Sequence, residues 1–101
     1  MKVCQFILPK NNVTAEEKEA FEVQLVDAHG GFTTHEVTGA WIDPDTDELV
    51  REVGDSYDVA VVEDKVLNLY AFVRTFLYAR GERYLYWAVA GSASINKLWS
   101  S

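Results

Sequence analysis

Apolar and polar residues alternate along the chain in segments of two kinds. Val3 to Leu8 is an apolar run that stops at Pro9, and this pattern predicts a buried strand. Between Thr14 and Gly30 the apolar residues recur at steps of three and four, which predicts a helix with one buried stripe. Thr14 and Glu17 fit a capping box, so this helix is expected to begin directly after Thr14.

The middle of the chain predicts a long hairpin. Threonine, valine and tryptophan residues between Phe32 and Trp41 favour an extended strand, and a second extended run begins at Leu49. The segment 43–48 between these runs has the aspartates and the proline of a turn. Gly54 and its polar neighbours interrupt the second run, so a bulge or a bend is expected there.

The last third of the chain predicts a helix followed by an aromatic strand. Asp64 is a plausible N-cap, and Gly81 marks the expected end of the helix. The helix has a wide apolar face, formed by Val66, Leu69, Tyr70, Val73, Phe76 and Leu77. Tyr84 to Ala90 follows as a final strand, and residues 92–101 are expected to form a short C-terminal tail of a single domain, 1–101.

The order strand, helix, strand, strand, helix, strand is that of the ferredoxin-like, or split βαβ, sandwich. It predicts an α+β fold in which two helices cover one face of a four-stranded antiparallel sheet. The other face of such a sheet is open to a partner, a ligand or a second copy of the chain. Strand alternation places either Tyr84 and Tyr86 or Leu85 and Trp87 on that open face.

Composition and charge narrow the classes of partner. The 101 residues include 16 acidic and 9 basic side chains, and the net charge of −7 disfavours direct binding to nucleic acid or to an anionic membrane. A partner with a basic surface is favoured instead. The single cysteine, Cys4, is expected to pack as a buried thiol, which predicts a reducing, cytoplasmic location. No apolar run in the sequence has the length of a signal peptide or a membrane span.

Three short motifs carry a resemblance to other proteins. They are Gly30-Gly31-Phe32-Thr33, Gly39-Ala40-Trp41 and Leu49-Val50-Arg51-Glu52. At these positions the chain resembles a loosely defined group of small uncharacterised bacterial and phage proteins with a ferredoxin-like pattern. The motifs are structural, so the resemblance implies the fold and an origin in a phage or mobile element. It implies no catalytic residues.

Catalytic and metal-binding motifs are not found in the sequence. Asp43, Asp45 and Asp47 alternate as in a calcium loop, but Glu48 stands where the loop needs glycine and Gly54 where it needs glutamate. No phosphate-binding glycine loop, nucleophile elbow or paired cysteine motif occurs. We therefore expect no catalytic residue, no metal and no cofactor.

Binding to another protein is the function that the sequence favours. The prediction is a small acidic phage or mobile-element accessory protein that binds, and inhibits, a host or defence protein with a basic surface. The expected contacts are aromatic anchors and turn acids, namely Trp41, Asp43, Asp45, Asp47, Tyr84, Tyr86, Trp87 and Trp99. A homodimer would also cover the aromatic face.

The alternative is a dimeric ferredoxin-like domain that binds a small ligand or acts as an enzyme. Its pocket would lie between the sheet and the helices. The side chains expected to line it are His35, Tyr57, Tyr84 and Tyr86. The sequence alone does not choose between this class and a protein-binding domain.

Overall fold

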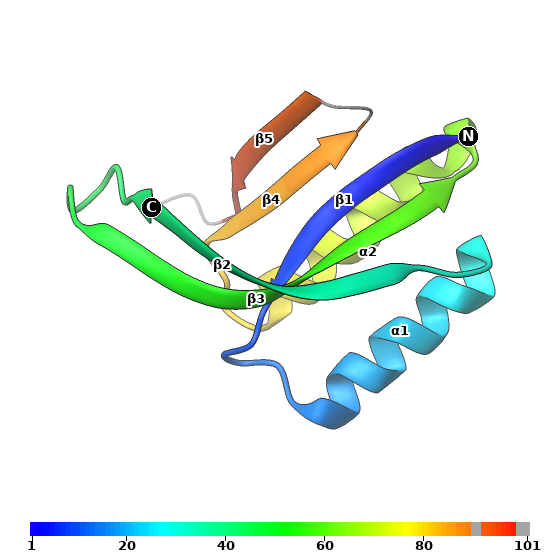
Figure 1. Ribbon diagram of the computed structural model, residues 1–101, viewed down its shortest axis with the longest axis horizontal. Coiled ribbons are helices and arrows are strands. Elements are labelled where there is room, and N and C mark those ends of the chain that lie inside the picture. Colours follow the sequence, from blue (N-terminus) through cyan, green and yellow to red (C-terminus); the bar gives the residue numbers. More distant parts are fainter. Residues whose placement is uncertain (90–91, 99–101) are drawn as a thin grey trace.

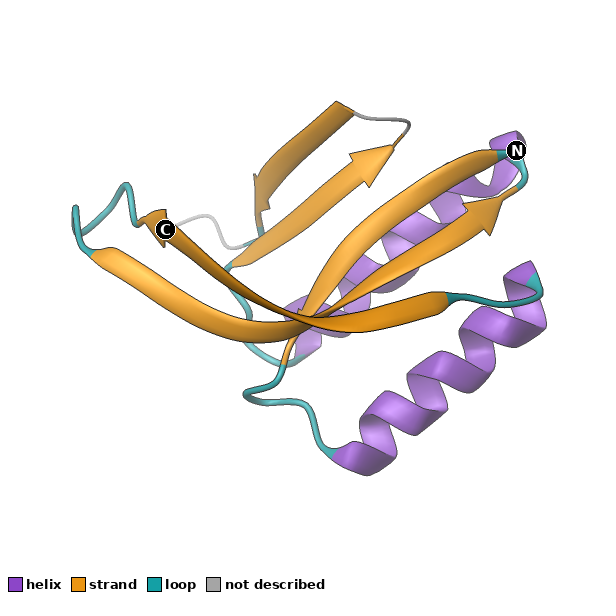
Figure 2. Cartoon of the chain, viewed as in Figure 1, coloured by secondary structure: helices purple, strands orange, loops and turns teal. Residues whose placement is uncertain are grey.

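The computed structural model describes residues 1–89 and 92–98 (Figures 1 and 2). Within these ranges the chain forms five strands and two α-helices. In chain order the elements are β1 (Lys2–Pro9), α1 (Ala15–His29), β2 (Thr33–Ile42), β3 (Leu49–Val61), a 3-10 helix η1 (Glu63–Lys65), α2 (Val66–Ala79), β4 (Tyr84–Val89) and β5 (Ser92–Lys97).

The strands form one antiparallel sheet, and both helices cover the same face of it. The strand order is β2-β3-β1-β4-β5. Phe21 of α1 lies edge-on to Phe6 of β1, and Tyr70 of α2 lies edge-on to Trp87 of β4. Phe6 and Trp87 are directly paired and so point to the same side of the sheet. The predicted α+β fold, with two helices against an antiparallel sheet, is confirmed.

The prediction of a four-stranded sheet was wrong, because residues expected to form a tail form β5 instead. This strand pairs antiparallel with β4, from Tyr84 opposite Lys97 to Val89 opposite Ser92. Without β5, one edge of the aromatic strand β4 would present unpaired backbone groups. Pairing along that edge outweighs the weak strand preference of the small polar residues in β5.

The start and the end of α1 agree with the sequence. The backbone amide of Glu17 donates to Thr14 Oγ1 at 3.1 Å, and the amide of Thr14 donates to Glu17 Oε1 at 2.9 Å. The predicted capping box is therefore confirmed. Gly30 ends the helix in the left-handed conformation, with φ of 90°, which glycine adopts without strain.

The buried stripe of α2 was predicted correctly, but its start was not. Leu69, Val73 and Leu77 are fully buried against the sheet. Asp64 lies within η1, and no side chain caps the first turn of α2. Because η1 leads directly into the helix, its backbone takes the place that a capping side chain would otherwise fill.

The main core lies between the helices and the sheet, and in it a group of aromatic rings packs among leucine and valine side chains. Phe6 stacks on Tyr57 at 5.2 Å and on Trp87 at 6.2 Å between ring centroids. The Tyr57 hydroxyl donates to Glu22 Oε2 at 2.6 Å, so this buried polar group has a partner. Burial and the nearby Glu22 raise the pKa of Tyr57 above its ordinary value. Cys4 is a buried free thiol, as expected, and burial raises its pKa.

The β2–β3 hairpin keeps one register throughout its length, so the bulge expected at Gly54 does not form. Gly54 pairs with Val37 on one side and with Pro9, the last residue of β1, on the other. A Cβ atom at Gly54 would lie 2.8 Å from both Ile7 Cγ2 and the Leu8 carbonyl oxygen. Glycine is therefore needed here because the end of β1 crosses very close to β3.

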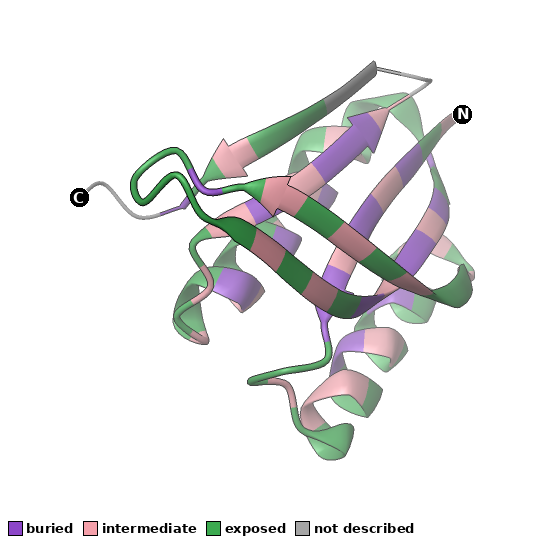
Figure 3. Cartoon of the chain, turned by 60° about the vertical axis from the view of Figure 1, so that its left-hand side comes forward, coloured by how far each residue is buried: buried purple, intermediate pink, exposed green. Residues whose placement is uncertain are grey.

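The outer half of the hairpin, residues 37–53, extends beyond the end of β1 and approaches β4 (Figure 1). In this half, more exposed and less exposed residues alternate along each strand (Figure 3). Pairing places the less exposed residues on the same side of the sheet as Ile7, which is the face opposite the helices. We call this side of the hairpin its inner face.

Candidate functional site

Four side chains gather where the inner face of the hairpin meets β4. Trp41 and Glu52 come from the hairpin, Tyr84 is the first residue of β4, and Glu82 lies just before it. The Trp41 and Tyr84 rings meet edge-on, with their centroids 6.5 Å apart. Glu52 stands diagonally across the strand pair from Trp41, and the charge of Glu82 reaches it. We call these four residues the inner-face cluster.

The two aromatic residues of the cluster carry polar atoms that lack partners. Trp41 Nε1 and the Tyr84 hydroxyl oxygen are both buried, and neither makes a hydrogen bond. Buried polar groups in folded proteins almost always have a partner, and leaving one without costs about 1–3 kcal/mol. Among the described residues the only other such atom is Arg80 Nε, so two of the three lie in this cluster.

The two carboxyl groups of the cluster are also incompletely matched. Burial raises the pKa of Glu52, and the charge of Glu82 raises it further. Burial likewise raises the pKa of Glu82, while a hydrogen bond from Asn12 at 3.3 Å acts in the opposite direction. Neither carboxylate forms an ion pair with any residue in the described ranges. The cluster thus combines two acids, two rings and no cation.

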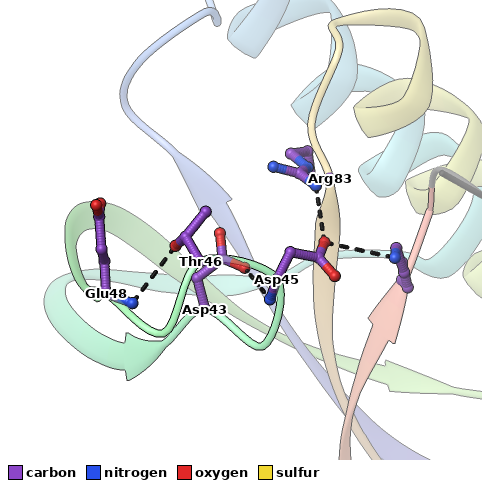
Figure 4. Close-up of polar contacts among 6 residues, drawn as sticks. Asp43, Asp45, Thr46, Glu48 and Arg83 are labelled. Atoms are coloured by element: carbon purple, nitrogen blue, oxygen red, sulfur yellow. Dashed lines mark hydrogen bonds and ion pairs between the residues drawn. The ribbon is translucent and has the colours of Figure 1, made fainter.

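One aspartate at the tip of the hairpin contacts the residue directly before β4 and a residue of β5 (Figure 4). Asp45 Oδ2 accepts a hydrogen bond from Arg83 at 3.0 Å and lies 3.5 Å from Lys97 Nζ. We call Asp45, Arg83 and Lys97 the latch. The latch holds the tip of the hairpin near the inner-face cluster. Because Arg83 is paired with Asp45, the latch also engages the cationic residue that directly follows Glu82 in the sequence.

The other acids of the turn serve its local structure. Asp43 is buried, and its Oδ1 accepts a hydrogen bond from the backbone amide of Asp45 at 2.8 Å. Asp47 is exposed and has a positive φ of 61°, which aspartate tolerates in a tight turn. Of the three aspartates predicted to meet a partner, only Asp47 has a side chain free of such contacts among the described residues.

The predicted aromatic contacts fall on both faces of the sheet. Trp41, Tyr84 and Tyr86 lie on the face opposite the helices and are half-buried. Trp87 is only 9% exposed and packs between Phe6 and Tyr70 on the helix side, so its burial removes it from the surface. Trp99 lies outside the described residues.

The pocket proposed from His35 and three tyrosines does not form as such. Tyr57 faces the helices, whereas His35, Tyr84 and Tyr86 belong to the opposite face. Sequence reasoning also missed Glu52 and Glu82 as candidate site residues. The alternation of Val50, Glu52 and Gly54 would have placed a carboxyl group on one face of the hairpin, but nothing local indicated that this face is covered.

Two other features were considered as sites. A cavity of about 210 Å³ lies at the start of α1, but its carboxylate, Asp55, is already paired with Lys18 at 3.0 Å and Lys10 at 3.7 Å. His29 ends α1, and burial together with the charge of Lys65 lowers its pKa, which favours the neutral imidazole. Among the described residues, no three potential ligands are placed to hold a metal ion, and no helix is long and apolar enough to cross a membrane.

Comparison with known proteins finds similarity in the fold. No family model and no curated protein sequence matches the chain. The structure is similar to a phage SAM lyase in complex with S-methyl-5'-thioadenosine, with a TM-score of 0.73, 8% sequence identity, and coverage of 99% of this chain and 92% of that chain. It is also similar to a phage SAM lyase in the apo state, with a TM-score of 0.66, 9% identity, and coverage of 99% and 91%.

Proposed function

We propose that this protein is a lyase of S-adenosylmethionine that releases S-methyl-5'-thioadenosine. The observation that carries the proposal is the inner-face cluster, in a fold that matches a phage SAM lyase over 99% of this chain. The proposal develops the alternative of a ligand-binding or enzymatic domain. It places the ligand on the face of the sheet opposite the helices, and not between the sheet and the helices.

The reaction breaks one carbon–sulfur bond. The sulfur of S-adenosylmethionine is a sulfonium, bonded to three carbons and positively charged. When its bond to the four-carbon amino acid chain breaks, the electron pair stays on sulfur, which becomes the neutral thioether of S-methyl-5'-thioadenosine. The amino acid fragment balances this change by losing a proton or by closing on its own carboxylate. No water and no other reactant is consumed.

The inner-face cluster has the groups that such a substrate needs. Trp41 and Tyr84, which meet edge-on, are aromatic side chains of the kind that attracts a sulfonium, an interaction worth about 0.5–2 kcal/mol. Glu52 and Glu82 balance the positive charge of the ligand. Because positive charge disappears as the bond breaks, these two carboxylates contribute to binding of the substrate and not to the cleavage step.

The test is to incubate the purified protein with S-adenosylmethionine and to measure S-methyl-5'-thioadenosine by liquid chromatography and mass spectrometry. S-Adenosylmethionine also decomposes slowly by itself, so samples without protein and with heat-denatured protein set the background. At a substrate concentration below saturation we expect Glu52→Gln to lower the rate at least about tenfold, whereas Glu16→Gln at an exposed position of α1 keeps it. Product formation no faster than the background in the wild type would refute the lyase.

We also propose a finer fold class and a location. The order of β1 to β4 and the two helices supports a ferredoxin-like unit, to which β5 adds a fifth strand. The cytoplasm is the proposed location, because the buried free thiol of Cys4 suits a reducing compartment.

Protein binding is a second candidate function, supported by the outer side of α1. Val23 and Val26 are 53% and 45% exposed there, and the exposed acids Glu19 and Asp27 flank them. These residues lie on one helical stripe, which fits a phage or mobile-element accessory protein that binds a basic surface on a host or defence protein. Binding to a partner protein that weakens as salt is raised, and that is lost in the double variant Glu19→Lys, Asp27→Lys, would support this function. Binding that is unaffected by salt and by the double variant would exclude this surface.

A further inference from the structure

We propose that Glu52 and Glu82 make the inner-face cluster selective for ligands that carry a positive charge at the position of the sulfur atom. The cluster then distinguishes a sulfonium nucleoside from the neutral thioether nucleoside that differs from it at that atom. This inference rests on the proposed function and assigns substrate selection to two named carboxylates.

The first support is the charge balance of the cluster. Glu52 feels the charge of Glu82, yet neither carboxylate has a cationic partner in the described part of the chain. Arg83 directly follows Glu82 but binds Asp45 in the latch. Two partly buried carboxylates without a cation repel each other, and a positively charged ligand relieves that repulsion. A neutral ligand does not.

The second support is independent of the acids. Trp41 Nε1 is a buried donor without an acceptor, and the buried Tyr84 hydroxyl has neither a donor nor an acceptor. The two rings meet at the same place, where the hairpin crosses to β4. A nucleoside offers hydroxyl and ring-nitrogen atoms that satisfy both groups, and its sulfonium lies favourably against an aromatic face.

The hairpin is fixed at both ends of this region, so the cluster keeps its geometry. The backbone amide of Lys10 donates to the Val53 carbonyl at 3.0 Å, which anchors the hairpin where β1 ends. Asp45 anchors the tip through Arg83 and Lys97. Groups held in place before binding lose little conformational freedom when the ligand arrives, which favours selectivity.

Selectivity of this kind also bears on the release of the product. Cleavage converts the sulfonium into a thioether, and the product then lacks the charge that Glu52 and Glu82 balance. We therefore expect the product to bind more weakly than the substrate.

The experiment compares two ligands that the proposed reaction does not consume. Sinefungin has a carbon bearing an amine in place of the sulfonium, so it is positively charged there, and S-adenosylhomocysteine has a neutral thioether. We measure both dissociation constants by isothermal titration calorimetry for the wild type, Glu52→Gln, Glu82→Gln and the control Glu16→Gln. We expect the wild type and the control to prefer sinefungin about tenfold, and Glu52→Gln to reduce the preference to about twofold or less.

The outcomes separate this inference from the lyase itself. If sinefungin is preferred and the preference disappears in Glu52→Gln, the inference stands even where no cleavage of S-adenosylmethionine is measured. If the protein cleaves S-adenosylmethionine but binds both ligands equally, or if Glu52→Gln keeps the preference, the inference is overturned and the lyase is retained. Absence of binding by both ligands also overturns it, provided that circular dichroism shows folded protein.

Discussion

Tyr57 and Tyr84 lie on opposite faces of the same sheet, and each carries a buried hydroxyl. The Tyr57 hydroxyl on the helix side donates to Glu22 at 2.6 Å, among stacked rings that exclude water. The Tyr84 hydroxyl, under the hairpin, has no partner. The hydroxyl on the helix side is therefore satisfied within the chain, whereas the hydroxyl on the hairpin side is not.

The same division appears in the acids. On the helix side Glu22 accepts the hydrogen bond of Tyr57, and Asp55 near the start of α1 pairs with two lysines. On the hairpin side Glu52 and Glu82 raise the folding cost, because each is partly buried and no described cation matches it. A cluster of groups that lower the stability of the folded protein is typical of a functional site.

The largest effect is expected from the helix side. Phe6→Ala removes a fully buried ring that contacts Tyr57, Trp87 and Phe21, and we expect a loss of about 3–5 kcal/mol in the free energy of unfolding. Urea denaturation followed by circular dichroism measures it. Ile95→Ala, at an exposed position of the opposite face, is the control and should cost less than about 1 kcal/mol. Similar losses of unfolding free energy in Phe6→Ala and Ile95→Ala would contradict the conclusion that the helix side of the sheet provides most of the stability.

The two tyrosines give the sharpest comparison, because one oxygen atom is removed from each face. Tyr57→Phe breaks the bond to Glu22 and should cost about 1–2 kcal/mol. Tyr84→Phe removes a hydroxyl that has no partner, so stability should stay equal or rise by up to about 1 kcal/mol. Urea denaturation of both variants and of the wild type, without ligand, measures the two changes in the free energy of unfolding. A clear loss in Tyr84→Phe would mean that its hydroxyl is bonded within the chain.

Glu52→Gln should stabilise the free protein at neutral pH, with a melting temperature higher by about 2–4 °C. The raised pKa means that the folded protein binds the Glu52 proton more tightly than the unfolded chain does. The stability contributed by this group is therefore present below its ordinary pKa of 4.5 and is lost as pH rises through the raised value.

Thermal melts of the two proteins between about pH 4 and pH 8 test this sign. The advantage of Glu52→Gln should grow as pH rises through the window above 4.5 and disappear below it. Glu82 shares the raised pKa and remains in both proteins, so its contribution largely cancels. An advantage that grows towards acid would show that the Glu52 carboxylate is stabilised in the folded protein.

The smallest effect is expected from the latch. Asp45→Asn removes an exposed ion pair and should lower the free energy of unfolding by only about 0.5 kcal/mol. The loss should shrink at high salt, because exposed charges are screened. Asp47→Asn makes the same charge change outside the latch and should have no comparable cost. Urea denaturation at low and high salt measures both, and equal losses would exclude a specific role for Asp45.

Features that depend on neighbouring residues were predictable from the sequence. Thr14 and Glu17 are three positions apart, and the spacing alone determines the capping box. The strand β5 was missed because its pairing partner, and not its own composition, makes it extended. Asp45 was expected to meet another protein, but it binds Arg83, which lies 38 positions further along the chain.

The candidate site was predictable only in pieces. Trp41 and Tyr84 were both named from the sequence as aromatic contacts, but nothing in their spacing indicated that they touch each other. Glu52 and Glu82 were not named, because their approach depends on the hairpin passing the end of β1 beside Gly54. That passage is a tertiary property, and the sequence signals it only as a glycine within a strand.

The central place of β1 in the sheet has a consequence for how the chain reaches this structure. Cys4 of β1 pairs with Val59 on one side and with Val89 on the other. Both edges of β1 are therefore covered only after residues from nearly the whole length of the chain have come together. Contacts between such distant residues form slowly, whereas the β2–β3 hairpin closes locally. During folding β1 is therefore an apolar strand with open edges, and it is the segment through which incompletely folded chains are expected to associate.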